Sequence, residues 1–167
     1  MKELARAMSN PSNGDWLKLK RLGRYIKGRP RLQQIFAWQL AQGMVTTYSD
    51  ADWAGCKQSR KSTTGGCITV GKHTIKGWSK TQALVALSSG ESELYASLKA
   101  AAETLGLMSM LKDSNWKMAG QVYGDASAAL GIIHRTGLGK TRHIDTSLLW
   151  IQQTAAERQL KFGKVFG

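Results

Sequence analysis

The acidic residues of this chain are few, and several lie where the carboxylates of an active site are expected. The chain has 11 Asp and Glu residues and a net charge of +13. Asp50 and Asp125 each end an extended run. Glu91 and Glu93 lie at the start of a long helical stretch, and Asp145 starts the last helical stretch. Hydrolysis of a phosphodiester by two metal ions needs several carboxylates that converge from different elements. The pattern therefore predicts divalent metals held against a polyanionic substrate.

Two neighbouring pairs of acids leave the choice of ligand to be decided. Asp50 and Asp52 lie on the same face if the strand continues, so either could be the ligand. Glu91 and Glu93 cannot share a role, because two successive steps along a helix separate their side chains by about 200°. Ser88 and Glu91 have the spacing of a capping box, in which Glu91 reaches back to the amide of Ser88. That interpretation assigns Glu91 to the helix cap and leaves Glu93 for the metal.

The two remaining acids also have a structural alternative. Asp125 and Asp145 could each cap the helix that follows it. Carboxylates gathered without a metal would repel one another and raise at least one pKa, which favours a bound cation where several of them meet. Mg²⁺ suits such a site because it prefers oxygen ligands.

Composition sets limits on the class of protein. A chain of 167 residues suits one domain, and 24 Lys and Arg residues favour nucleic acid or an anionic membrane as partner. The longest apolar runs are too short to span a membrane, and the N-terminus lacks the apolar core of a signal peptide. Cys56 and Cys67 are predicted to be free thiols in a reducing compartment, with a structural disulfide as the alternative, and the histidines form no zinc-binding spacing with them.

Hydrophobic periodicity and turn residues predict the elements that must position the acids. Helices are predicted at 12–28, 89–112, 126–134 and 145–158, and strands at 45–49, 66–70, 74–78, 84–87 and 120–125, with a further short strand at 35–38. Strands first, then helices alternating with a strand, favour an α/β fold with a mixed sheet. The first helix has a basic surface, and both packing on a neighbouring domain and contact with phosphates remain open for it.

Several motifs resemble the ribonuclease H domain of copia-type long-terminal-repeat retrotransposons. The resemblance extends from about Val45 to Lys164, with the motifs in the family's order. They are Tyr48-Ser-Asp-Ala-Asp-Trp-Ala-Gly55, Ser62-Thr-Thr-Gly65, Trp78-Ser-Lys80 with Gln82, Ala86-Leu-Ser-Ser-Gly-Glu-Ser-Glu-Leu-Tyr-Ala96, Asp125-Ala-Ser-Ala128 and Lys140-Thr-Arg-His-Ile-Asp145.

The resemblance implies a ribonuclease H-like fold, a mixed five-stranded sheet flanked by helices. It also implies cleavage of the RNA strand of an RNA–DNA hybrid with two Mg²⁺ ions, for which Mn²⁺ can substitute. The implied metal ligands and catalytic residues are Asp50, Glu93, Asp125 and Asp145. The candidates for binding the substrate are Lys57, Arg60, Lys61, Lys80, Lys140, Arg142 and His143. Contacts of these residues with phosphates would make binding fall with salt and carry little sequence preference.

The N-terminal part has a resemblance of its own. Residues 1–43 are similar to the connection between the family's polymerase and its ribonuclease H, and 44–167 form the ribonuclease H-like domain. The chain therefore looks like a fragment of a polyprotein or a product derived from one, with the polymerase part as a candidate second partner and no membrane partner. An intracellular location, in a cytoplasmic particle or the nucleus, is expected.

Two departures from the family leave alternatives open. Ala126 stands where the family commonly has Asn, and Gly90 where it commonly has Thr. Lost hydrogen bonds around a metal site can weaken metal binding or activity by roughly 10–100-fold. The alternatives are a catalytically decayed module that still binds nucleic acid, and a ribonuclease H-like nuclease that acts on DNA.

Overall fold

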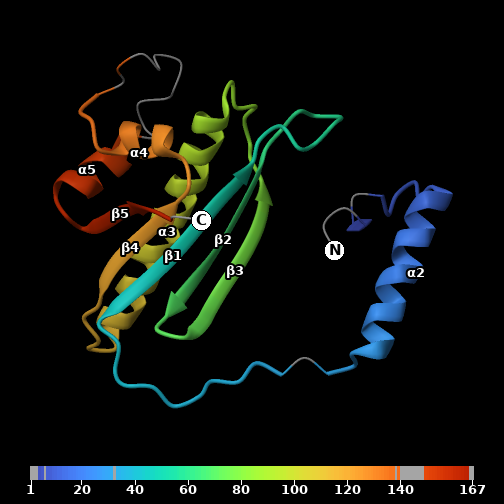
Figure 1. Ribbon diagram of the computed structural model, residues 1–167, viewed down its shortest axis with the longest axis horizontal. Coiled ribbons are helices and arrows are strands. Elements are labelled where there is room, and N and C mark those ends of the chain that lie inside the picture. The colour runs from blue at the N-terminus through green and yellow to red at the C-terminus, as the bar shows by residue number, and fades with distance from the viewer. Residues whose placement is uncertain (1–3, 6, 32, 138, 140–148, 166–167) are drawn as a thin grey trace. The chain divides into compact units, whose positions relative to one another are not determined.

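The computed structural model describes residues 4–5, 7–31, 33–137, 139 and 149–165 (Figure 1). Contacts divide the chain into two units, Met1–Ala37 and Trp38–Gly167. The sequence places its boundary slightly later, between residues 43 and 44, immediately before the first strand. The assignment of 1–43 to a connecting segment stays a prediction.

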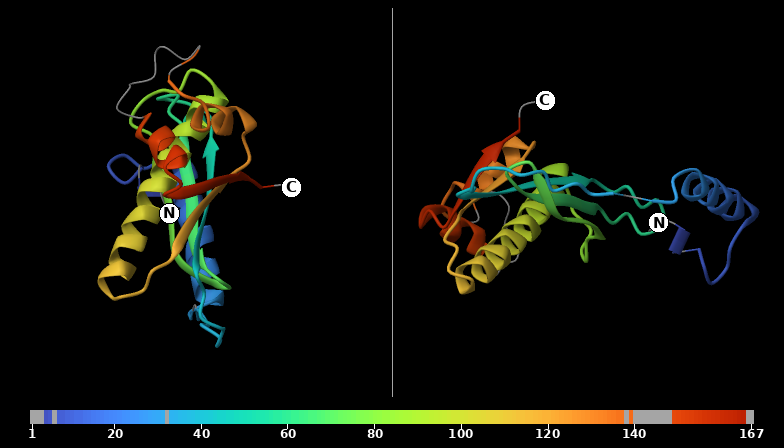
Figure 2. Two further views of the ribbon diagram at one scale, coloured as in Figure 1. Left: turned by 90° about the vertical axis from the view of Figure 1, so that its left-hand side faces the viewer. Right: turned by 90° about the horizontal axis from the view of Figure 1, so that it is seen from below.

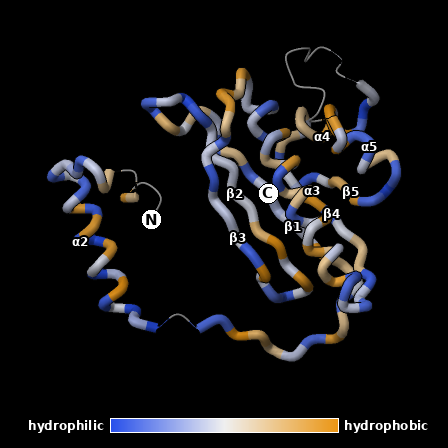
Figure 3. Tube along the Cα trace, turned by 180° about the vertical axis from the view of Figure 1, so that it is seen from behind, coloured by the Kyte–Doolittle hydropathy of each residue, from blue (hydrophilic) through white to orange (hydrophobic). Residues whose placement is uncertain are grey.

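The N-terminal unit contains α2 (Asn13–Gly28), which confirms the helix predicted at 12–28. Ser12 caps this helix, since its hydroxyl accepts a hydrogen bond from the backbone N of Asp15 at 3.3 Å. The Asp15 carboxylate in turn accepts one from the backbone N of Ser12 at 3.1 Å, which completes a capping box. Apolar and polar residues alternate along α2 (Figure 3), and none of its residues is buried.

The second unit is built around a mixed sheet of five strands in the order β3-β2-β1-β4-β5 (Figure 1). The strands are β1 (Met44–Asp52), β2 (Thr63–Val70), β3 (His73–Thr81), β4 (Ala119–Gly124) and β5 (Leu160–Lys164). β1, β2 and β3 pair antiparallel in sequence, whereas β4 pairs parallel with both β1 and β5. The predicted α/β fold with a mixed five-stranded sheet is confirmed.

Alternation along β1 decides which side chains enter the core. Val45, Thr47 and Ser49 are buried, while Tyr48 and Asp50 are exposed, as expected for a strand with one covered face. The covered face packs on α3 (Ser89–Asp113), which lies alongside the sheet (Figure 2). The hydroxyls of Thr47 and Thr104 are 2.6 Å apart and link β1 to α3 inside the core.

Two further helices complete the core on the same unit. They are α4 (Ser127–Ile133) and α5 (Trp150–Ala156). The buried cluster joins α3, α4 and α5 to the sheet and contains Leu94, Leu98, Ala100, Ala101, Val122, Ala129, Ile132, Ile133, Ile151 and Leu160. The helices predicted at 89–112 and 126–134 are confirmed. Of the helix predicted at 145–158, the described part contains α5, and residues 140–148 lie outside the described residues.

Two predicted strands are wrong, and one strand was missed. Residues 35–38 and 84–87 have no strand structure, and the fifth strand is instead β5. The run at 84–87 is short and apolar, a pattern that does not by itself distinguish a strand from other structure. Leu84, Val85 and Leu87 are exposed there. The carbonyl of Ala86 accepts a hydrogen bond from the Trp53 indole rather than from a neighbouring strand.

Two smaller features complete the description. Cys56 and Cys67 are not joined in a disulfide, as predicted. Among the described residues, no helix combines the length and apolar character that crossing a membrane requires.

Candidate metal centre

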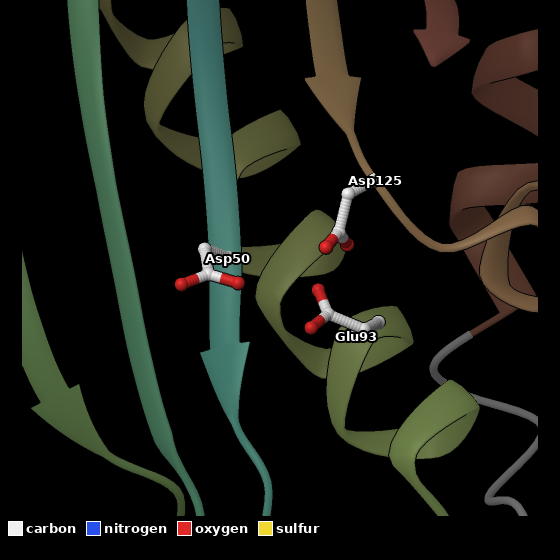
Figure 4. A group of neighbouring side chains, drawn as sticks. All are labelled: Asp50, Glu93 and Asp125. Atoms are coloured by element: carbon white, nitrogen blue, oxygen red, sulfur yellow. The ribbon is translucent and has the colours of Figure 1, made fainter. Parts of the chain in front are cut away.

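Three carboxylates from three different elements meet at one edge of the sheet (Figure 4). Asp50 comes from β1, Glu93 from α3, and Asp125 from the residue after β4. Each offers an oxygen that lies within 4.8 Å of the other two. Convergence of carboxylates at this range is the arrangement in which a divalent cation with oxygen ligands is held.

The parallel pairing of β1 and β4 brings Asp50 and Asp125 to the same edge. Tyr48 lies opposite Tyr123 in the register, and each tyrosine precedes one of these aspartates by two residues. The two tyrosine rings stack, with centroids 5.7 Å apart and an interplanar angle of 22°. The register that pairs the two tyrosines also brings Asp50 and Asp125, each two residues further along, to the same end of the sheet.

Glu93 approaches the same edge from the helix. Its side chain is 8% exposed, and its Oε1 accepts a hydrogen bond from the backbone N of Ala51 at 3.0 Å. The pKa of Glu93 is raised to about 7, mainly by burial and then by the charges of Asp125 and Asp50, while the hydrogen bond from Ala51 opposes the rise. A cation between the three carboxylates would offset both the burial of this charge and the repulsion from its neighbours.

The two acids kept as alternatives lie outside this group. Asp52 is exposed and is not among the three converging carboxylates. Glu91 is buried, and its carboxylate accepts hydrogen bonds from the backbone N of Leu87 at 2.8 Å and from the hydroxyl of Tyr95 at 3.2 Å. Ser88 caps α3 as predicted, but Glu91 reaches back to the amide of Leu87 rather than to that of Ser88.

Four of the residues proposed for the substrate are described, and they lie on two segments. Lys57, Arg60 and Lys61 belong to the loop between β1 and β2, and Lys80 lies exposed on β3. The loop is closed by backbone hydrogen bonds from Arg60 to Cys56 at 2.7 Å and from Cys56 to Lys61 at 3.2 Å. Lys57 and Arg60 are exposed and Lys61 is partly buried, so all of them reach the surface.

Four residues of the predicted site belong to the segment 140–148. Asp145, Lys140, Arg142 and His143 lie outside the described residues. Their roles as fourth metal ligand and substrate contacts stay predictions.

A basic residue at the same edge was missed with the strand that carries it. The Nζ of Lys164, at the end of β5, donates a hydrogen bond to the hydroxyl of Ser127 at 3.0 Å, two residues after Asp125. The alternation of apolar and other residues in Leu160-Lys-Phe-Gly-Lys164 was the available signal for this strand.

The comparisons with known sequences find relatives among transposon polyproteins. No family model matches the chain. It is 29% identical over 164 residues to the retrovirus-related Pol polyprotein from transposon TNT 1-94 of Nicotiana tabacum. It is 34% identical over 110 residues to the retrovirus-related Pol polyprotein from transposon RE2 of Arabidopsis thaliana. These matches cover 97% and 66% of the chain, but the chain spans only 12% and 8% of the two polyproteins.

A third relative is shorter. The chain is 36% identical over 104 residues to secreted RxLR effector protein 161 of Plasmopara viticola, a match that covers 62% of this chain and 72% of that protein.

Among solved structures, the chain is similar to two of LC11-RNase H1. The structure of LC11-RNase H1, isolated from compost, gives a TM-score of 0.49 at 18% sequence identity and covers 74% of this chain and 85% of that one. LC11-RNase H1 in complex with an RNA/DNA hybrid gives a TM-score of 0.45 at 16% identity, with 72% and 84% covered.

Proposed function

We propose a function from one premise: the chain belongs to the ribonuclease H domains of copia-type retrotransposon Pol polyproteins. On that premise, the chain is a metal-dependent endonuclease that hydrolyses the RNA strand of RNA–DNA hybrids during reverse transcription. The observation that carries the proposal is the convergence of Asp50, Glu93 and Asp125 within 4.8 Å. These are three of the four residues that the family pattern assigns to metal binding.

The three carboxylates fit a divalent cation. They supply oxygen ligands only, which favours Mg²⁺ and allows Mn²⁺. Asp50, Glu93 and Asp125 would hold the ions, and Asp145 is the proposed fourth ligand. When bound, the ions supply a Lewis acid that lowers the pKa of water and stabilises negative charge on the phosphate.

The protein prepares this site through its own contacts. The hydrogen bond from the Ala51 amide orients the Glu93 carboxylate, and Ala51 directly follows Asp50. The bond therefore ties β1 to α3 at the point where both contribute a ligand. A carboxylate held in place before binding loses less rotamer freedom when the substrate and ions arrive.

The substrate follows from charge and from the family. A net charge of +13 favours a polyanion, and Lys57, Arg60, Lys61 and Lys80 are proposed to contact backbone phosphates. The 2′-hydroxyls in the wide minor groove would distinguish RNA from DNA. The polymerase part of a polyprotein is proposed as a second partner, in a cytoplasmic particle or the nucleus.

One observation favours a second candidate function, a decayed module that binds nucleic acid without cutting it. Ala126 is the N-cap of α4, directly after Asp125, and it provides no side-chain hydrogen bond there. A polar side chain at this position would satisfy an amide of the helix start and steady the neighbouring carboxylate.

Cleavage of three labelled substrates separates the candidates. RNA–DNA hybrid, RNA duplex and DNA duplex are incubated with the protein and Mg²⁺, beside the variants Asp50→Asn and Glu93→Gln. The proposal expects cleavage of the hybrid alone and its loss in both variants. Asp52→Asn is the matched control, because Asp52 lies on the same strand outside the carboxylate group, and it should remain active.

Other outcomes would replace the proposal. Cleavage of the DNA duplex would favour a DNA nuclease. Binding of the hybrid without cleavage would favour the decayed module. Loss of activity in Glu91→Gln but not in Glu93→Gln would overturn the assignment of the ligand on α3.

A further inference from the structure

The carboxyl ends of three parallel strands share the edge that carries the acids. β4 pairs parallel with β1 on one side and with β5 on the other. Gly124 lies opposite Lys164 in the register, and the backbone N of Val165 donates to the carbonyl of Gly124 at 2.9 Å. Because Gly124 directly precedes Asp125, Lys164 is placed next to the strand end that carries one of the three carboxylates.

The side chain of Lys164 is held toward the segment that follows Asp125. Its Nζ lies 3.0 Å from the Oγ of Ser127, and both residues are exposed. Within the described part of the chain, ion pairs involve Lys18, Lys76 and Lys99, and none involves Lys164. The ammonium is thus anchored by a neutral hydroxyl and keeps its charge available at the surface.

The positive charge of Lys164 can offset the negative charge of the three carboxylates where a phosphate backbone approaches them. The three carboxylates repel a phosphate backbone, and the ions offset that repulsion only at the phosphates they bind. A lysine beside Asp125 attracts the next part of the backbone, and the Ser127 hydroxyl, which accepts from Lys164, still has its own hydrogen to donate. An ammonium and a hydroxyl side by side provide two donors for phosphate oxygens.

We propose that Lys164, positioned by Ser127, binds a backbone phosphate of the nucleic-acid substrate on the Asp125 side of the carboxylate group. The inference rests on the proposed function, since it takes nucleic acid as the substrate. It adds a contact on β5, separate from the basic loop between β1 and β2. The two contacts would hold the backbone from two different segments of the fold.

Salt dependence of binding tests the assignment. A labelled RNA–DNA hybrid is titrated with protein in Ca²⁺ at several salt concentrations, and fluorescence anisotropy gives the affinity. Loss of one phosphate contact reduces the slope of log affinity against log salt by about 0.9. We expect that reduction, with several-fold weaker binding at low salt, for Lys164→Met, and little change for Lys164→Arg, which keeps the charge.

Lys161→Met is the matched control. Lys161 is exposed on the same strand, but it lies opposite Gln121, away from the edge where the acids meet. Its replacement removes the same charge and should leave the slope close to that of the unchanged protein. Thermal unfolding of each variant checks that the strand is retained, and Lys164→Arg tests the position if Lys164→Met is less stable.

Two results would overturn the inference: an unchanged slope in Lys164→Met, or equal reductions in Lys164→Met and Lys161→Met, which would indicate a general charge effect. The cleavage assay distinguishes failure of this inference from failure of the proposed function. A protein that binds the hybrid with the expected slope change but cuts nothing supports Lys164 as a contact while the nuclease proposal fails. If the protein cuts the hybrid but Lys164→Met leaves the salt slope unchanged, the nuclease proposal stands and the Lys164 contact fails.

Discussion

Replacement of Glu93 by Gln is expected to remove a pH-dependent loss of stability from the metal-free protein. The pKa of Glu93 is raised from 4.5 to about 7, mainly by burial and then by the charges of Asp125 and Asp50. Below pH 4.5 both the folded and the unfolded chain hold this proton, and the contribution is constant. As the pH rises from 4.5 to about 7, only the unfolded chain releases it, so the free energy of unfolding falls. Above about pH 7 both states are ionised and the loss is complete.

The size of the loss follows from the two pKa values. The rise from 4.5 to about 7 corresponds, at 1.36 kcal/mol per pKa unit, to about 3 kcal/mol. Most of it, roughly 2–3 kcal/mol, falls between about pH 5 and about pH 8. Gln has no charge to bury, and its side-chain oxygen can still accept the hydrogen bond that Glu93 receives from Ala51.

Urea unfolding in the presence of a chelator, followed by tryptophan fluorescence, measures this difference. The stability of Glu93→Gln relative to the unchanged protein should increase by roughly 2–3 kcal/mol from about pH 5 to about pH 8. Asp52→Asn is the control, because Asp52 is exposed outside the carboxylate group, and its profile should parallel that of the unchanged protein. Parallel profiles for Glu93→Gln as well would refute the argument that burial and repulsion act on this side chain.

Addition of Mg²⁺ at about pH 8 extends the same experiment. A ligand at about 100 times its Kd stabilises the folded state by about 2.7 kcal/mol. The unchanged protein should gain stability with Mg²⁺ in this way, and Glu93→Gln should gain much less because one ligand oxygen has lost its charge. Equal gains in both proteins would show that Mg²⁺ binds elsewhere.

Three further substitutions test the packing around the site. Gly66→Ala should destabilise the protein by about 1–3 kcal/mol in urea unfolding, because a Cβ at Gly66 would overlap the ring of Trp78; a change near zero would mean that the ring can move aside. Thr104→Val should cost about 1–3 kcal/mol, since it leaves the buried hydroxyl of Thr47 without this partner. The double change to Val at both threonines should then cost less than the sum of the single changes, and strict additivity would contradict the coupling. Ala126→Asn should raise the melting temperature by supplying the missing cap of α4, worth about 1 kcal/mol; an unchanged melting temperature would show that the amide is already satisfied.

Local patterns in the sequence were sufficient where one residue or a short run determines the structure. Ser12 and Gly28 mark the ends of α2, and Ser88 marks the start of α3, as predicted. The spacing of Glu91 and Glu93 separated a helix cap from an inward-facing carboxylate, because helix geometry alone sends them in different directions. The partner of Glu91 was still wrong by one residue, since Leu87 and not Ser88 donates the hydrogen bond.

The sequence predicted strands less well than helices, because a strand depends on partners that are distant in the chain. The apolar run at 84–87 has no strand beside it and forms a loop, while 160–164, with a less apolar sequence, pairs with β4. Strand pairing depends on which segments the fold of the whole chain brings next to one another. The sequence of a short run does not determine those neighbours. For the same reason Lys164 was not recognised at the edge of the sheet.

The sequence by itself determined the kinds of residue available: a small set of acids at the ends of predicted elements, on a strongly basic chain. Only the tertiary structure decided that Asp50, Glu93 and Asp125 meet while Asp52 stays apart. The physical reason is that β1 and β4, which are far apart in the sequence, pair in parallel, so that Asp50 and Asp125 lie at the same end of the sheet. The packing of α3 on these strands then brings the carboxylate of Glu93 to them. Chemistry is specified by residue type, but proximity is specified by pairing and packing across the whole domain.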